Sequence, residues 1–169
     1  MVAPYWKGRI GVLTTTDNRQ LYASPQDDTQ TAFLNFIQTA EKQVLIADYS
    51  FNLIQLETIL PTLKSRGVEV RLALDRSQSR GKTEKGVIAE LQSAGIDMVI
   101  GTSSKHQIMH DKFAVIDTRT IYGSWNFTKN ASAEDNFFII DPNPQVSAWF
   151  ASVWNNIYDW IKANEPQTN

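Results

Sequence analysis

The sequence predicts an α/β fold in which a mixed, mostly β sheet is flanked by helices on both faces. Strand-like apolar runs alternate with helical patterns in the first half of the chain and cluster in the second half. One long amphipathic helix follows them. Elements in this order predict a mixed sheet covered on both sides. A chain of 169 residues fits one domain with a core of its own.

Strands are expected where short apolar runs lie between polar or turn-forming residues. These runs span residues 8–13, 21–23, 44–51, 68–75, 96–100, 112–116, 120–122 and 137–140. Helices are expected where apolar residues recur at helical spacing. These segments span residues 28–42, 53–63, 84–94 and 146–161.

Individual residues set the helix boundaries. Asp27 or Asp28 can cap the first helix, and Gly95 ends the third. Pro61 interrupts the second helix, which either kinks there or gives way to another short helix. In the last helix, one apolar stripe is expected. It consists of Val146, Trp149, Phe150, Val153, Ile157, Trp160 and Ile161.

Composition narrows the classes of function. The chain has no Cys, which excludes disulfides, thiol catalysis and Cys-ligated zinc. Neither a secretory signal nor a membrane-spanning run is visible, so a cytoplasmic protein without stable membrane association is expected. The net charge of −2 counts against a general polyanion binder, although a local basic groove remains compatible with it.

The chemically most informative residues are His110 and Lys112. They begin an apolar strand that ends at Asp117, and Ser124 and Asn126 follow it. Because strand side chains alternate, His110 and Lys112 are expected on the same face. Lys is almost never buried without a partner, so this pair does not suit a core. It suits a phosphodiester, because imidazole can attack phosphorus and ammonium can hold phosphate oxygens.

These residues resemble the HxKxxxxD signature of the phospholipase D superfamily. The segments Gly123-Ser124-x-Asn126 and Glu134-Asp135-Asn136 resemble the rest of that signature. Over about residues 21–160 the chain looks most like the short, single-motif bacterial endonucleases of the superfamily. The resemblance implies a phospholipase D-like fold with one catalytic domain, residues 21–163. Residues 1–20 are then an N-terminal extension, which includes the possible first strand, and residues 164–169 are a polar tail.

The resemblance also implies roles for the motif residues. The residue corresponding to His110 forms a phosphohistidine, and Lys112 and Asn126 bind the non-bridging oxygens. Ser124 is expected to hydrogen-bond phosphate or a neighbour in the site. No metal and no cofactor are implied, because side chains supply both the nucleophile and the positive charge.

The acidic residues of the motif leave alternatives open. In the family, an acidic residue in this region orients the nucleophilic imidazole through its far nitrogen, as the third member of a serine triad does. Either Glu134 or Asp135 can take this part, and Asp135 is favoured because it directly precedes Asn136. Asp117 either belongs to the catalytic set, as its place in the signature suggests, or holds the turn at the end of the strand.

The chain carries one HxK motif only, because His106 has no Lys two residues on. The resemblance implies a mechanism with a second such His, which protonates the leaving oxygen and later activates water. This chain then requires a homodimer that brings both copies of His110 to one site. The expected substrate is DNA, with RNA as a further candidate. The rivals are a phosphatidyl lipid such as cardiolipin, and a catalytically silent module that binds nucleic acid.

Other residues are candidates for contacts with nucleic acid. Lys105 and Lys129 flank the motif and are expected to touch phosphates away from the reacting bond. Trp125 belongs either to the core or to a base-stacking surface. A basic cluster is either a solvated loop or an arm that touches the nucleic-acid backbone. It consists of Arg76, Arg80, Lys82 and Lys85.

Overall fold

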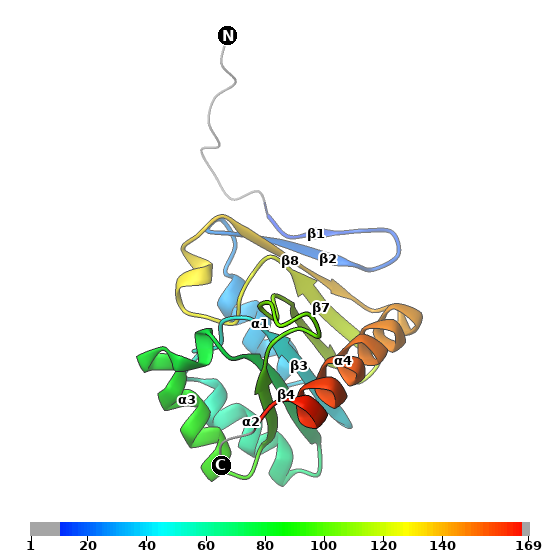
Figure 1. Ribbon diagram of the computed structural model, residues 1–169. Coiled ribbons are helices and arrows are strands. Elements are labelled where there is room, and N and C mark those ends of the chain that lie inside the picture. The colour runs from blue at the N-terminus through cyan, green and yellow to red at the C-terminus, as the bar shows by residue number, and fades with distance from the viewer. Residues whose placement is uncertain (1–10, 167–169) are drawn as a thin grey trace.

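A computed structural model describes residues 11–166 of the chain and confirms the mixed α/β fold (Figure 1). In these residues one sheet has the strand order β1-β2-β8-β7-β6-β3-β4-β5. The strands are β1 (Leu13–Thr14), β2 (Gln20–Ser24), β3 (Gln43–Asp48), β4 (Glu69–Asp75), β5 (Asp97–Gly101), β6 (Lys112–Ile116), β7 (Arg119–Gly123) and β8 (Asn136–Asp141). The helices are α1 (Thr29–Ile37), α2 (Leu56–Ser65), α3 (Lys82–Ser93) and α4 (Pro144–Asn164), with short 3₁₀ turns η1 (Gln78–Arg80) and η2 (Asn130–Ser132).

Strand β3 joins the parallel and antiparallel parts of the sheet. It pairs in parallel with β4, which pairs in parallel with β5, and it pairs antiparallel with β6. The end of β3 therefore lies against the start of β6, where Asp48 is opposite Lys112. The end of β7 and the start of β8 reach the same edge, since Gly123 pairs with Phe138. This edge is termed the site edge below.

Two helical layers cover the sheet. Helices α1, α2 and α3 bury one face, where Phe33 and Trp125 lie in the larger apolar core. Helix α4 crosses the other face and buries a smaller core around Trp154 and Phe113 (Figure 1). The prediction of helices on both faces is therefore confirmed, and Trp125 is a core residue that is 1% exposed.

Most boundaries agree with the sequence pattern, with three instructive differences. Asp28 is the N-cap of α1 and accepts a hydrogen bond from Thr31 N at 3.2 Å, but the helix ends at Ile37. Pro61 lies inside one continuous helix, so no second helix begins there. Of the strand expected over residues 8–13, the first three residues lie outside the described part of the chain, and the strand observed there, β1, begins only at Leu13.

The predicted stripe of α4 is confirmed in part, but it wrongly includes Trp149 and misses two residues. The confirmed members pack in or against the smaller core and are Phe150, Val153, Ile157, Trp160 and Ile161. Trp149 is 62% exposed, whereas Trp154 and Tyr158 are buried. Each buried ring has a partner for its polar atom. Trp154 Nε1 donates to the carbonyl of Ile46 at 2.8 Å, and Tyr158 Oη donates to the carboxylate of Asp97 at 2.8 Å. These partners allow polar aromatic residues to face the sheet.

Residues 102–111 connect β5 to β6 and must pass the ends of β4 and β3, which lie between those strands in the sheet. This segment is termed the crossover loop. Ser103 and Gln107 close a turn within it, since Ser103 N donates to Gln107 O at 2.7 Å. The crossover loop delivers His110 to the site edge.

Candidate active site

His110 and Lys112 meet at the site edge, as the strand pattern predicts. The exposed imidazole of His110 packs against the edge of the Tyr49 ring, with 4.6 Å between ring centroids. Lys112 Nζ lies 5.2 Å from the same ring centroid and donates to the carbonyl of His110 at 2.8 Å. An aromatic ring after β3 therefore holds the imidazole and the ammonium side by side, and the imidazole remains open to solvent.

Asp48 belongs to this site, although the motif did not identify it. Its side chain is fully buried beside Lys112, and Oδ2 accepts a hydrogen bond from Phe127 N at 2.9 Å. Oδ1 has no hydrogen-bond partner in the described part of the chain. Burial raises the pKa of Asp48 well above its usual value, against the attraction of Lys112. The sequence did carry a signal, because an acidic residue ends the apolar run 44–47.

Burial has the opposite effect on the pKa of Lys112. Desolvation lowers the pKa of Lys112, while the nearby carboxyl groups of Asp48 and Asp111 act to raise it. Burial also raises the pKa of Asp111. Moving the negative charge of a phosphate next to Lys112 would favour the ammonium form further. The site is thus prepared for an anionic ligand.

Ser124 holds the start of β8 and does not point a free hydroxyl at the imidazole. Its Oγ donates to Asn136 Oδ1 at 3.0 Å and accepts from Phe137 N at 3.1 Å. Gly123 permits this close approach, because a Cβ at that position would lie 2.3 Å from Phe137 O. Ser124 therefore positions the strand that borders the site.

Asn126 follows Ser124 after one residue, and Asp48 accepts a hydrogen bond from the next backbone N–H, that of Phe127. Asn126 Oδ1 is buried without a hydrogen-bond partner among residues 11–166. Its amide nitrogen also makes no hydrogen bond to those residues, so it keeps both N–H donors for a ligand. These donors are a second group, besides the Lys112 ammonium, that can hold a phosphate oxygen.

Glu134 and Asp135 are both exposed before β8. Asn136 Nδ2 lies 3.5 Å from Glu134 Oε2, and Ser24 Oγ donates to the carbonyl of Glu134 at 2.8 Å. Neither carboxylate hydrogen-bonds His110 among the described residues. The choice between them as the group that orients the imidazole stays a prediction.

The structure places Asp117 away from His110, which favours the structural one of its two expected roles. Asp117 follows the last residue of β6 and is seven residues from His110, about 20 Å along an extended strand. Its carboxylate accepts backbone hydrogen bonds from Glu41, Lys42 and Gln43 at 2.9, 2.8 and 3.0 Å. Burial acts to raise the pKa of Asp117, but these hydrogen bonds outweigh it and lower that pKa. Asp117 fastens the start of β3, the alternative role considered from the sequence.

Lys105 and Lys129 are exposed, in the crossover loop and after Phe127 respectively, and their role in substrate contacts stays a prediction. Lys129 N donates to Asn52 Oδ1 at 3.2 Å, which ties its backbone to the segment after β3. His106 packs on Trp160 of α4, with ring centroids 5.7 Å apart, and does not join His110. The site therefore contains one imidazole from this chain.

Comparison with known proteins decides the family. The family model described as cardiolipin synthase, PLD-like domain, matches residues 33–157. The chain belongs to the phospholipase D superfamily. The match includes the segments that carry His110, Lys112 and Asn126, so the resemblance drawn from the motif is confirmed.

Relatives of this phospholipase D superfamily chain carry different names. Phospholipase D of Rickettsia felis is 34% identical over 125 residues, which are 72% of this chain and 60% of that protein. The mitochondrial cardiolipin hydrolase of Xenopus tropicalis is 31% identical over 154 residues, covering 83% of this chain and 71% of the relative. The chain thus spans about 60% of the length of the Rickettsia felis relative.

Solved structures match the fold of this superfamily member over nearly their whole length. Nuc of Salmonella typhimurium has a TM-score of 0.78 at 24% identity, covering 85% of this chain and 95% of Nuc. NucT of Helicobacter pylori has a TM-score of 0.74 at 21% identity, covering 83% and 94%. Within residues 11–166 no helix combines the length and apolar character needed to cross a membrane.

Proposed function

We propose that this chain is a metal-independent phosphodiesterase that cleaves DNA through a phosphohistidine, with RNA as a further candidate substrate. The imidazole of His110 attacks phosphorus and forms a P–N bond as the P–O bond to the leaving oxygen breaks. The Lys112 ammonium and the Asn126 amide hold the non-bridging oxygens, where negative charge builds up. Water then attacks the phosphohistidine, releases His110 and leaves a phosphate monoester.

One observation carries this proposal. An imidazole open to solvent lies next to a half-buried ammonium, and the amide of Asn126, one residue before the Phe127 N–H that binds Asp48, has unused donors. In this set, His110 supplies the nucleophile, and Lys112 and Asn126 stabilise charge. A mechanism built from these side chains does not need a metal ion to activate water or to neutralise phosphate.

The leaving oxygen needs a proton, and the need for a proton donor is the reason to propose a dimer. The sequence contains two histidines, and His106 packs against α4. We place the partner subunit's His110 as the general acid, which protonates the leaving oxygen and then activates water. Apolar side chains at the site edge support a second copy there. Ile54, Ile108 and Phe137 are 66%, 48% and 51% exposed, and burying them against the partner would stabilise the dimer.

DNA is preferred to lipid because of the cations around the site. Lys105 and Lys129 flank the motif in the sequence, are exposed and suit a substrate with phosphates beyond the reacting one. Cleavage of a phosphatidyl lipid such as cardiolipin is the second candidate, which the names of the Rickettsia and Xenopus relatives favour.

The deciding experiment compares substrates for the purified chain in EDTA. Single-stranded DNA, duplex DNA and cardiolipin vesicles are offered to wild type, to His110→Ala and to Asn126→Ala. We expect DNA cleavage in EDTA, loss by several orders of magnitude in His110→Ala, and a loss of about 10²–10³-fold in Asn126→Ala. Cleavage of cardiolipin alone would establish the lipid alternative. Activity that disappears in EDTA and returns with magnesium would refute metal independence.

A further inference from the structure

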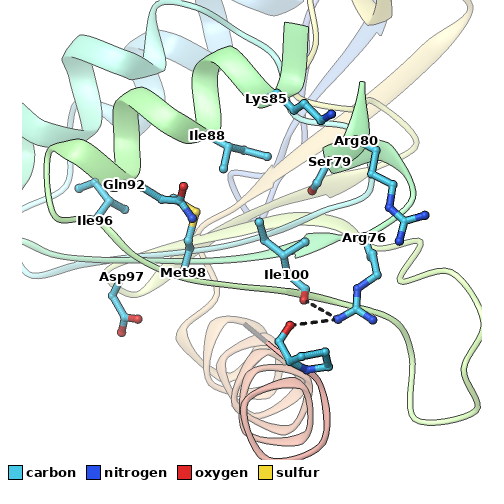
Figure 2. A pocket seen from close by; sticks show the side chains of 11 residues that line it. Arg76, Ser79, Arg80, Lys85, Ile88, Gln92, Ile96, Asp97, Met98 and Ile100 are labelled. Atoms are coloured by element: carbon cyan, nitrogen blue, oxygen red, sulfur yellow. Dashed lines mark hydrogen bonds between the residues drawn. The ribbon is translucent and has the colours of Figure 1, made fainter. Parts of the chain in front are cut away.

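A groove outside the active site is lined in part by basic side chains that the proposed reaction does not use. It lies between α3 and the edge strand β5 and encloses about 880 Å³. Arg80 and Lys85 lie at one end of it, and Asp97 lies at the other (Figure 2). Ile88, Met98 and other apolar side chains form its floor. The groove is thus cationic at the end near η1, the short turn that follows β4.

The positive charge of this segment is concentrated. Residues 76–85 carry four cationic side chains and one carboxylate, whereas the whole chain has a net charge of −2. The carboxylate, Glu84, is turned toward the segment after β3, where Ser50 Oγ and Asn52 Nδ2 lie 3.3 and 3.1 Å from its Oε1. It therefore does not pair with the cations of the groove.

The cations divide into one that stabilises the fold and others that remain available. Arg76 forms an ion pair with Glu165 at 2.5 Å and donates to the carbonyls of Ile100 and Pro166 (Figure 2). Arg80 and Lys85 are exposed and form no ion pair within residues 11–166. Two unpaired cations at the mouth of one groove provide donors for an anion.

The groove is fixed in position relative to the nucleophile. Asp75 is buried at the end of β4, and its carboxylate accepts hydrogen bonds from Ser77 N at 2.8 Å and from Met109 N at 2.8 Å. Met109 directly precedes His110. A second link starts at η1, where Gln78 Nε2 donates to Tyr49 Oη at 3.0 Å, and the Tyr49 ring packs against His110. Both links tie the turn that carries Arg80 to the imidazole.

We propose that this groove is a second phosphate-binding site, in which Arg80 and Lys85 hold the backbone of a nucleic-acid strand away from the bond that His110 attacks. This inference rests on the proposed nuclease function and adds the path of the substrate. The phosphates contact Arg80 and Lys85, and sugars and bases lie over the apolar floor. Contacts of this kind position the strand without reading its sequence.

The test compares two double variants with the same loss of charge. Arg80→Gln with Lys85→Gln removes the groove cations. Lys42→Gln with Arg66→Gln removes exposed cations that precede β3 and β4, at the opposite edge of the sheet. Both pairs are made in wild type and in His110→Ala, which prevents cleavage during titration. Thermal unfolding of each protein checks that the fold is retained.

Binding is measured by fluorescence anisotropy with labelled single-stranded DNA of about 20 and about 4 nucleotides. Each phosphate contact to a single strand contributes about 0.7 to the slope of log affinity against log salt. Loss of two contacts should lower that slope by about 1.4. Between 50 and 200 mM salt, the affinity of the groove variant for the long DNA should therefore fall about sevenfold less than that of wild type. The short DNA and the control pair should show little change.

The outcomes separate this proposal from the nuclease function. If wild type cleaves DNA and the groove pair keeps the wild-type slope on long DNA, the groove proposal is refuted and the nuclease function stands. If wild type neither binds nor cleaves DNA, both are refuted. If the groove pair loses binding to phosphatidylcholine vesicles that contain cardiolipin while it binds DNA normally, the groove serves a lipid surface and the proposal is wrong.

Discussion

Removal of the Asp117 carboxylate should destabilise the fold and spare the chemistry at His110. The carboxylate accepts three backbone hydrogen bonds from residues 41–43, and residue 117 has a φ of +56°. At about 1 kcal/mol each, reduced because two of the donors are exposed, these bonds contribute about 2 kcal/mol. The left-handed conformation costs Ala about 1 kcal/mol. Asp117→Ala should lose about 3 kcal/mol in total, and Asp117→Asn about 1 kcal/mol, since Asn keeps one acceptor and tolerates this φ.

Thermal unfolding followed by circular dichroism measures the loss. For a chain of this size, 3 kcal/mol lowers Tm by about 6–12 °C. Because the folded-state pKa of Asp117 is lowered, its contribution is present above the unfolded-state pKa and is lost as the pH falls through the folded-state value. The Tm gap between wild type and variant should therefore shrink in acid. Asp159→Ala, at an exposed position of α4 away from the site, is the control. An unchanged Tm together with a hundredfold slower DNA cleavage in Asp117→Ala would refute the structural role.

Two further predictions concern the charge at the site and the dimer. The alkaline limb of the kcat/KM profile should fall below the ordinary Lys pKa of about 10.4, because burial lowers the pKa of Lys112 and the ammonium form binds phosphate. Lys112→Arg should move that limb to higher pH, and an unmoved limb in an active variant would assign it to another group. When wild type is mixed with His110→Ala and the subunits exchange, activity should fall faster than dilution predicts. A linear decline, or full activity from a monomer in light scattering, would show that one chain suffices.

The chemistry of the site could be predicted where its residues are neighbours in sequence. Lys112 begins β6 and His110 lies two residues before it in extended sequence spacing, so alternation alone predicts them on one face. Asp48 and Tyr49 reach them from a distant part of the chain through the antiparallel pairing of β3 with β6. No local pattern determines which strands become neighbours in a mixed sheet. The buried carboxyl and the ring that packs on the imidazole were therefore missed.

Helix α4 shows a second reason why part of the structure could not be predicted from the sequence. Helical spacing shows that one face is apolar, but several overlapping stripes of aromatic residues fit the same sequence. Trp154 and Tyr158 face the sheet because Ile46 O and Asp97 accept their hydrogen bonds there. Trp149, by contrast, is exposed to solvent. The choice depends on acceptors in other strands, which the sequence of the helix does not contain.

The crossover loop allows substrate selection to change independently of the chemistry. Its exposed residues 104–108 lie between two attachments, the turn closed at Ser103 and the hydrogen bond from Met109 to Asp75. Lengthening an exposed loop costs little, about 0.6 kcal/mol for each doubling. Insertions between the attachments would leave His110 in place and change what can approach it. In this fold, specificity can therefore be redesigned in one short surface segment while the sheet and the nucleophile stay the same.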